Sequence, residues 1–259
     1  MIQIQVTDYI MLVAFWLSFS RWLAVIMQLP IMEHNAIPAP VKILSTLVIT
    51  YAFFPATSGE VVKDIQYMGV DKFWLLTAYN VIVGLILGYF VKSIMDIYIS
   101  AGSLITQNVG FAAVRYYDPS AGQQVGPFEM LIQWTMLIMI ISSGALLPMF
   151  KGVFNSFLSI HIYDLGKFAH SPEYFFDMFK SIFFSALLLA SPLIFTNMML
   201  NVVMGIMSKT VPQMNVIMVS FVLNIGIGLL VFAATSEEFF QVAYRMYTES
   251  LGKWFQFVS

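Results

Sequence analysis

Few side chains in this sequence are of the types that carry acid-base, nucleophilic or metal chemistry. The 259 residues include three histidines and no cysteine, which excludes disulfides, zinc-thiolate sites and thiol catalysis. His161 and His170 do not have the spacing of paired helix ligands, and no carboxylate lies at ligand spacing from them. The sequence also lacks a phosphate-binding loop, a dinucleotide fingerprint and a nucleophile elbow. We therefore expect no catalytic residues, no cofactor and no metal site.

The composition is typical of a membrane protein. Hydrophobic residues make up 59% of the chain and charged residues 10%, whereas soluble domains average roughly 25% charged residues. A soluble protein with so few charges would lack the polar surface that keeps it dispersed. The net charge of -2 leaves no basic surface for nucleic acid. The sequence therefore predicts an all-α membrane protein that crosses the bilayer several times.

The apolar runs predict about six hydrophobic helices in a single domain that covers residues 1–259. We place these helices at residues 9–29, 41–54, 73–107, 128–150, 182–207 and 216–234. The segment 41–54 is short for a hydrocarbon core of roughly 30 Å, and a charged loop is expected at 55–72. Thr235-Ser-Glu-Glu238 has the spacing of a capping box. We expect a separate amphipathic helix to follow it at the C-terminal end.

Arg21 lies inside the first apolar run. An arginine within a membrane costs several kcal/mol unless it is paired or reaches water. One interpretation is that Arg21 snorkels to the interface or pairs with a neighbouring helix of the same chain. The other is a structural contact with a partner subunit.

Five polar residues recur at spacings of three and four in the continuation of the third helix. They are Ser93, Asp96, Ser100, Ser103 and Gln107, which places them on one face of a helix. This stripe is compatible with close packing of small residues against another helix. The alternative is a face that lines an aqueous conduit, and Asp96 favours water or a paired partner because a lone carboxylate in lipid is costly.

Two later helices carry similar polar rows. Asn197 and Asn201 lie one turn apart in the fifth helix, and Ser220, Asn224 and Gly228 are spaced by four in the sixth. We expect these two helices to pack closely, with the amides as hydrogen-bonding groups between helices.

Residues 108–127 form the long interruption between apolar segments. The interruption contains Gly110, Phe111, Tyr116, Tyr117, Asp118 and Pro119. Irregular backbone between membrane helices is tolerated only where it is wet or packed in protein. Long loops in compact proteins are more often functional than not, although a plain surface connection is the alternative.

Several motifs resemble the FliR/SpaR/YscT family of type III export apparatus proteins. Around the first turn these are Arg21, Pro30, Pro38 and Lys42, and in the central loop they are Tyr117-Asp-Pro-Ser120. The most specific stretch runs from Val211 to Gly228 and includes Pro212, Gln213 and Asn215. The chain departs from the family pattern at Val222, where a proline is common, and at Ala113 and Tyr116, which stand at places where the family carries phenylalanines.

The resemblance implies a non-enzymatic core subunit of the export gate in the bacterial inner membrane. Its implied partners are FliP-like and FliQ-like subunits, an FlhB-like switch protein, membrane lipid and exported unfolded polypeptides. The implied fold is a set of tilted helical hairpins packed in a hetero-oligomer. Flagellar and virulence-type systems share these motifs, and overall similarity favours a flagellar basal body.

We further expect the segment from Gly110 to Pro119 to close the conduit with packed aromatic rings, with Gly102 and Gly110 allowing it to bend. Two other functions remain open at this point. A small transporter or channel for a solute predicts ionisable groups paired at mid-membrane. A membrane scaffold without a conduit predicts no such loop function.

Overall fold

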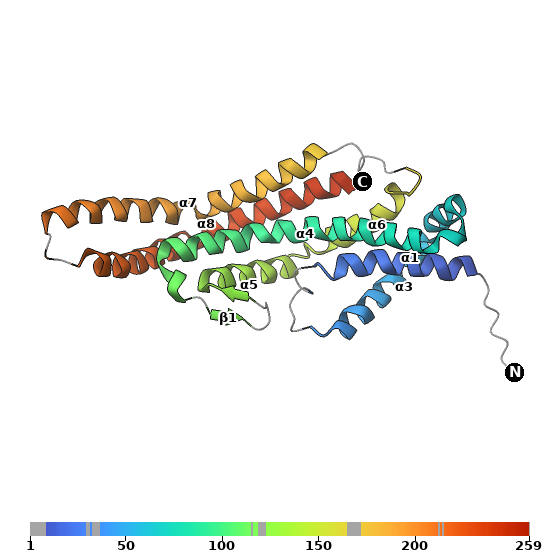
Figure 1. Cartoon of the computed structure of the whole chain (residues 1–259), viewed down its shortest axis with the longest axis horizontal. Helices are drawn as coiled ribbons and strands as arrows, with labels where there is room; N and C mark the ends of the chain where they lie inside the picture. Colours follow the sequence, from blue (N-terminus) through green and yellow to red (C-terminus); the bar gives the residue numbers. More distant parts are fainter. Residues whose placement is uncertain are drawn as a thin grey trace. The chain divides into compact units, whose positions relative to one another are not determined.

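The structure is a computed structural model that describes residues 9–29, 32, 37–114, 116–118, 123–164, 172–211, 213 and 215–258. Its α-helices are α1 (Tyr9–Ile26), α3 (Ala39–Met68), α4 (Phe73–Val109), α5 (Pro127–Ser142), α6 (Leu147–Ser159), α7 (Pro172–Thr210) and α8 (Val216–Val258) (Figure 1). Short 3-10 helices cover η1 (Val70–Lys72) and η2 (Phe111–Val114), and β1 (Tyr116–Asp118) pairs with β2 (Gln123–Val125). Pro30, Pro119 and Pro212 lie outside the described residues.

Five of these helices are long and apolar enough to cross a membrane. The count rises to six if α5 and α6, which meet at a bend of 72°, act as one broken span. This confirms the predicted all-α membrane protein of about six hydrophobic helices. The small β1–β2 hairpin is an addition that the sequence did not predict.

The described chain forms two compact units. The first unit comprises residues 1–92, 145–174 and 251–259, and the second comprises residues 93–144 and 175–250. Each unit is therefore assembled from segments that are distant in the sequence. The prediction of one domain covering the whole chain stays a prediction.

The predicted loop at residues 55–72 is wrong, because α3 continues through Pro55 to Met68. A proline inside a helix removes one backbone hydrogen bond, so packing must hold this helix together. Immediately before Pro55, the ring of Phe54 lies 5.3 Å from that of Phe15, and the ring of Phe53 lies 5.4 Å from that of Trp22. These contacts with α1 hold the helix immediately before the position that the proline weakens.

The predicted helix at residues 128–150 is broken into α5 and α6. Gly144 has a φ of 71° in the turn between them. This left-handed conformation is the usual way in which a glycine ends a helix. Pro148 lies in the first turn of α6, where its missing amide removes no helical hydrogen bond.

The predicted break at Thr235–Glu238 is also wrong, because α8 runs without interruption for 43 residues. Thr235 Oγ1 donates to the Val231 carbonyl at 2.8 Å, and Ser236 Oγ donates to the Ala233 carbonyl at 3.0 Å. These hydroxyls bond backwards within the helix, as Ser and Thr do in helix interiors, and do not cap a new one. The predicted apolar stripe is real, since Ala243, Tyr247, Leu251 and Trp254 are all buried.

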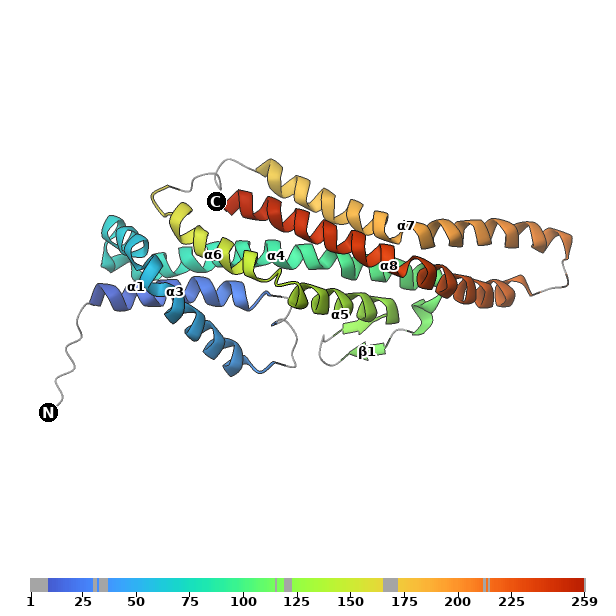
Figure 2. The ribbon, with the colours of Figure 1, turned by 180° about the vertical axis from the view of Figure 1, so that it is seen from behind.

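In the second unit, α7 and α8 form an antiparallel hairpin (Figure 2). Residues of both helices line the same cavities, including Leu193 of α7 and Asn224 of α8. Tyr98 of α4 donates its hydroxyl proton to the carbonyl of Ala243 in α8 at 3.0 Å. This hydrogen bond joins α4 to the α7–α8 hairpin within the second unit.

Candidate functional site

The first unit contains a cluster of buried polar side chains around Arg21, which is 1% exposed. Its Nε donates to Asn80 Oδ1 at 3.0 Å, and its Nη1 donates to the Ser156 carbonyl at 2.9 Å. The guanidinium also lies over the ring of Phe157, 4.3 Å from its centroid. Arg21 therefore pairs with α4 and α6 of its own chain, which confirms the first of the two interpretations given above.

Glycines allow α4 to approach α1 closely beside this cluster. A Cβ atom at Gly84 would lie 2.5 Å from the carbonyl oxygen of Arg21 and 2.8 Å from Ala24 Cβ. Only a glycine fits such a contact. The close approach brings Asn80, one turn earlier on α4, within reach of the guanidinium, and Asn80 in turn donates to the Leu76 carbonyl at 2.9 Å.

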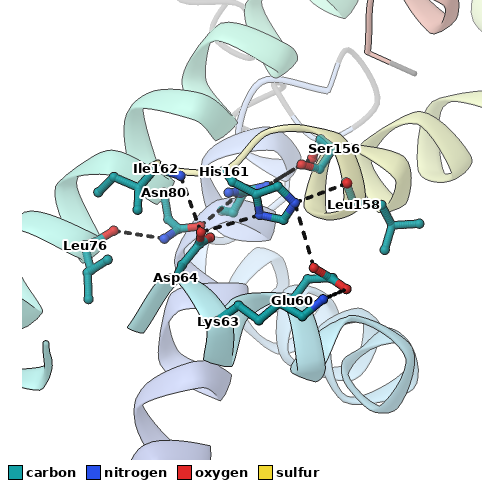
Figure 3. Close-up of polar contacts among 10 residues, drawn as sticks. Glu60, Lys63, Asp64, Leu76, Asn80, Ser156, Leu158, His161 and Ile162 are labelled. Carbon is teal, nitrogen blue, oxygen red and sulfur yellow. Dashed lines mark hydrogen bonds and ion pairs between the residues drawn. The ribbon is translucent and has the colours of Figure 1, made fainter. Parts of the chain in front are cut away.

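A second group of side chains joins α3 to the end of α6 (Figure 3). His161 Nδ1 lies 3.4 Å from Asp64 Oδ1, its Nε2 lies 3.2 Å from the Leu158 carbonyl, and Glu60 Oε2 is 3.9 Å away. The Ile162 amide donates to Asp64 Oδ1 at 3.4 Å. Asp64 is 4% exposed and interacts electrostatically with Arg21.

The C-terminal end of α6 explains why cationic or proton-donating groups gather here. The last carbonyl groups of a helix lack partners within the helix and carry its partial negative charge. Arg21 binds the Ser156 carbonyl and His161 lies at the Leu158 carbonyl. The cluster therefore provides hydrogen-bond donors for carbonyl groups at the buried C-terminal end of α6. It also joins α1, α3, α4 and α6. Among the described residues, no group of three His, Cys, Asp or Glu side chains is placed to hold a metal ion.

Sequence reasoning missed most of this cluster. Asp64 falls within the predicted loop at residues 55–72, and Asn80 lies in the apolar part of the predicted hydrophobic helix at residues 73–107. The signal was present in α3, where the buried residues Thr57, Val61 and Asp64 recur at helical spacing. Asn80 and Arg21 are also polar residues in two different apolar runs. Because polar side chains inside a membrane need hydrogen-bond partners, such residues are expected to pair with each other.

The polar stripe of α4 lies in the second unit, and its residues differ in burial. Ser93 is buried, Asp96 and Ser103 are half-buried, and Ser100 and Gln107 are exposed. Gln107 Nε2 donates to Ser103 Oγ at 3.2 Å. The opposite side of the helix is buried at Ile94, Ile97, Ala101 and Ile105. The one-sided pattern is therefore confirmed, while its role as a conduit or partner surface stays a prediction.

Gly102 does not act as a bend, because it lies within the continuous helix α4. A Cβ atom there would lie 2.7 Å from Glu129 Cα. The glycine therefore allows α4 and α5 to pack backbone against backbone. Gly126 has a similar role, since its Cβ would lie 2.5 Å from Thr106 Cγ2, and its amide donates to Glu129 Oε2 at 3.1 Å.

Gly110 has a φ of 93° and ends α4. Phe111 follows in η2, and its ring contacts that of Phe128 edge-on, with 5.9 Å between centroids. Tyr116, Tyr117 and Asp118 form β1, with Tyr116 opposite Val125 and Asp118 opposite Gln123. In the part of the predicted loop that the structure describes, the irregular backbone is replaced by the end of α4, by η2 and by the paired strands β1 and β2.

The remaining motif residues have local structural roles. Pro38 precedes the first residue of α3 in an extended conformation, and the Lys42 carbonyl accepts the hydroxyl of Thr46 at 2.7 Å. Asn215 Oδ1 accepts the Met218 amide at 3.3 Å and caps the start of α8. Gln213 is exposed, and buried Gly228 leaves room for Val109. Their proposed contribution to assembly stays a prediction.

Comparison with known proteins gives matches along nearly the whole chain. The sequence profile of "Bacterial export proteins, family 1" matches residues 12–250. The flagellar biosynthetic protein FliR of Bacillus subtilis (strain 168) is 25% identical over 243 residues, covering 91% of this chain and 90% of the relative. The FliR of Escherichia coli (strain K12) is 23% identical over 227 residues, covering 85% and 84%.

A relative from another kind of system matches equally broadly. The Yop proteins translocation protein T of Yersinia pestis is 23% identical over 225 residues, covering 85% of this chain and 84% of the relative. The match to the family profile, over residues 12–250, includes residues of both compact units and overlaps every helix described above. This chain therefore belongs to the bacterial export proteins of family 1.

Proposed function

We propose that this chain is a non-catalytic subunit of a bacterial type III protein export gate in the inner membrane. The observation that carries the proposal is the family match over residues 12–250, with relatives named for flagellar biosynthesis and for Yop protein translocation. The helices support it, because five of them are long and apolar enough to span a bilayer. The subunit forms part of the wall around a passage for unfolded polypeptides.

The fold leaves large apolar surfaces for other components to cover. In α3, Leu44, Val48 and Tyr51 are 63%, 59% and 75% exposed and recur on one face. Helices that bury so little of their apolar surface must contact lipid or other proteins. We assign the proteins among these contacts to FliP-like and FliQ-like subunits and an FlhB-like switch protein.

The segment from Gly110 to Pro119 is the proposed gate of this subunit. It leaves the helical wall at a positive-φ glycine and carries Phe111, Tyr116 and Tyr117. Aromatic rings packed across a passage block small ions, yet a polypeptide displaces them at a cost of about 1.5–3 kcal/mol for each ring. The stripe from Ser93 to Gln107 is the proposed conduit-facing or partner-facing surface.

The test uses a strain that lacks this gene and produces its partner genes. The wild-type chain restores export, and tagged chain retains the partner subunits after extraction in mild detergent. Replacing Phe111, Tyr116 and Tyr117 together with Gly increases ion leakage without loss of assembly. Failure of the wild-type chain to restore export or to retain partners overturns the subunit assignment. An unchanged leak in a fully assembled complex overturns the gate.

A solute transporter is the second candidate, because the first unit contains the buried ionisable side chains Arg21, Asp64 and His161. These groups bind helix carbonyls, an amide and one another, as a structural cluster does. A transporter is stable alone in detergent, whereas a gate subunit depends on its partners. Purification of the chain alone and with its partners therefore separates the two functions.

A further inference from the structure

The C-terminal end of α4, from which the proposed gate segment leaves, is held by a side-chain amide of α7. Asn197 Nδ2 donates to the carbonyl oxygen of Asn108. This carbonyl is among the last four of α4, which have no partner within the helix. Asn201 Nδ2 donates to Asn197 Oδ1 at 2.8 Å and orients the Asn197 amide for this contact. The polar row predicted on α7 therefore acts on α4.

Val109, the last residue of α4, and Gly110, which follows it, lie against α8. A Cβ atom at Gly228 would lie 2.8 Å from both methyl carbons of Val109, so this glycine forms the notch that receives Val109. A Cβ atom at Gly110 would lie 3.7 Å from Ile225 and 3.8 Å from Phe221. Three consecutive residues at the base of the gate segment thus each contact the α7–α8 hairpin.

A small cavity adjoins these contacts. Its volume is about 10 Å³, and it is lined by Asn108, Val109, Asn197 and Asn224 among others. Asn224 Oδ1 is buried and has no hydrogen-bond partner among the described residues. A cavity of this size holds about one water molecule. The contact between α4 and the hairpin is therefore polar and incompletely filled, unlike a close-packed core.

The surface of the α7–α8 hairpin near its contact with the end of α4 is exposed in the described chain. Met198 and Val202 of α7 are 59% and 57% exposed, and Val222 of α8 is 67% exposed. Forces from surrounding lipid or subunits therefore act directly on the hairpin. Moving the hairpin away from α4 breaks the Asn197–Asn108 hydrogen bond and withdraws Gly228 from Val109.

We propose that Asn197 and the Gly228 notch form a latch that holds the base of the gate segment closed, and that displacement of the α7–α8 hairpin opens it. This proposal rests on the proposed gate function of the segment from Gly110 to Pro119. Asn197 is a positioning residue, because it holds the backbone at Asn108 and does not itself close the passage. The positive φ at Gly110 allows the segment to turn once this backbone is released.

The first test measures ion leakage in the assembled complex. Asn197→Leu keeps the side-chain size but removes the donor, and loss of one net hydrogen bond shifts a two-state population about fivefold. We expect the closed complex to leak about fivefold more, whereas Asn197→Gln retains an amide donor and leaks less than Asn197→Leu. Ser208→Ala is the control, because the exposed Ser208 hydroxyl of α7 donates to the Gly205 carbonyl of its own helix.

The second test locks the latch covalently and stays informative if Asn197→Leu fails to assemble. The chain has no cysteine, so introduced thiols have no competitors within it. An ideal Cβ at position 228 lies 3.2 Å from Val109 Cβ, near the spacing that a disulfide requires. We expect the oxidised Val109→Cys/Gly228→Cys pair to stop export and reduction to restore it, with each single variant unaffected by oxidation.

The leakage test and the disulfide test distinguish a failure of the proposed latch from a failure of the proposed gate. If the triple glycine variant of Phe111, Tyr116 and Tyr117 leaks but Asn197→Leu does not, the latch is wrong and the gate stands. If the disulfide between positions 109 and 228 forms and export continues at the wild-type rate, the latch does not need to open. That result overturns the latch proposal. If neither variant leaks in assembled complexes, both proposals are wrong.

Discussion

Gly152 of α6 lies directly against the indole ring of Trp254 near the end of α8. A Cβ atom at position 152 would overlap the six-membered ring of Trp254, which is 1% exposed. The contact belongs to the first unit and joins residues about a hundred positions apart in the sequence. The nearby Lys151 ammonium lies 5.6 Å from the centroid of the Phe255 ring, which adds a second contact between α6 and the end of α8.

Gly152→Ala is expected to destabilise the first unit, because the added methyl group displaces the indole ring. Overpacking of this kind costs about 1–3 kcal/mol. The measurement is thermal unfolding of the complex in detergent. Gly59→Ala is the matched control, since a Cβ there contacts nothing within 4 Å, and Ala stabilises an unobstructed helix position by about 0.4–1 kcal/mol. Equal melting temperatures for the two variants would contradict the contact.

Asn80→Leu is expected to destabilise the first unit by about 1–3 kcal/mol, because it leaves the buried Nε of Arg21 without its acceptor. Combining it with Arg21→Met removes both groups. The double variant should lose less stability than the sum of the two single variants, since each single change strands a buried partner. Additive losses in the double-mutant cycle would show that the two side chains act independently.

Asp64→Leu is expected to be more damaging than Glu60→Leu. Asp64 is buried, accepts the Ile162 amide and lies beside His161 and Arg21, whereas Glu60 pairs mainly with exposed Lys63. Removing one member of a buried charged group costs about 3–5 kcal/mol, while exposed pairs contribute little. The difference is measured as the amount of folded protein recovered from membranes. Asp64→Asn keeps an acceptor for the Ile162 amide, so it should restore most of the folded protein that Asp64→Leu loses.

Gly102→Val is expected to separate α4 from α5, because the side chain would occupy the space of the Glu129 backbone. Ion leakage should rise along with the loss of stability, since Phe128 of α5 contacts the ring of Phe111 in the proposed gate segment. Gly205→Ala on α7 provides the control, as nothing lies within 4 Å of its Cβ position. Wild-type stability for Gly102→Val would show that the helices do not approach as closely as the structure indicates.

Hydropathy and polar periodicity predicted the long helices well. The spacing from Ser93 to Gln107 correctly extended the third helix, which ends at Val109. That pattern is local, so the sequence alone reveals it. Prediction failed at Pro55 and at Thr235, where local sequence signals indicated helix breaks. At Pro55 packing against α1 keeps the helix continuous, and the Thr235 hydroxyl donates to a carbonyl within α8 and does not cap a new helix.

The buried cluster could not be assembled from the sequence, because its members come from four helices. Arg21 and Ser156 are 135 residues apart, and Arg21 and Asn80 are 59 apart. The packing of α1 against Gly84 of α4 brings Arg21 and Asn80 together. The contacts of the proposed latch show the same limitation. The polar rows on α7 and α8 predicted contact between these two helices, but they did not predict that Asn197 and Gly228 also contact the end of α4.

The interleaved chain of the first unit sets an order for its biogenesis. Residues 9–92 leave the ribosome early, but Trp254, which fills the notch at Gly152, is added only after the entire second unit has been synthesised. Until Trp254 is synthesised, the surface of α6 at Gly152 lacks the aromatic ring that covers it in the folded unit. The first unit can therefore complete its packing only after the C-terminal part of α8 has been made.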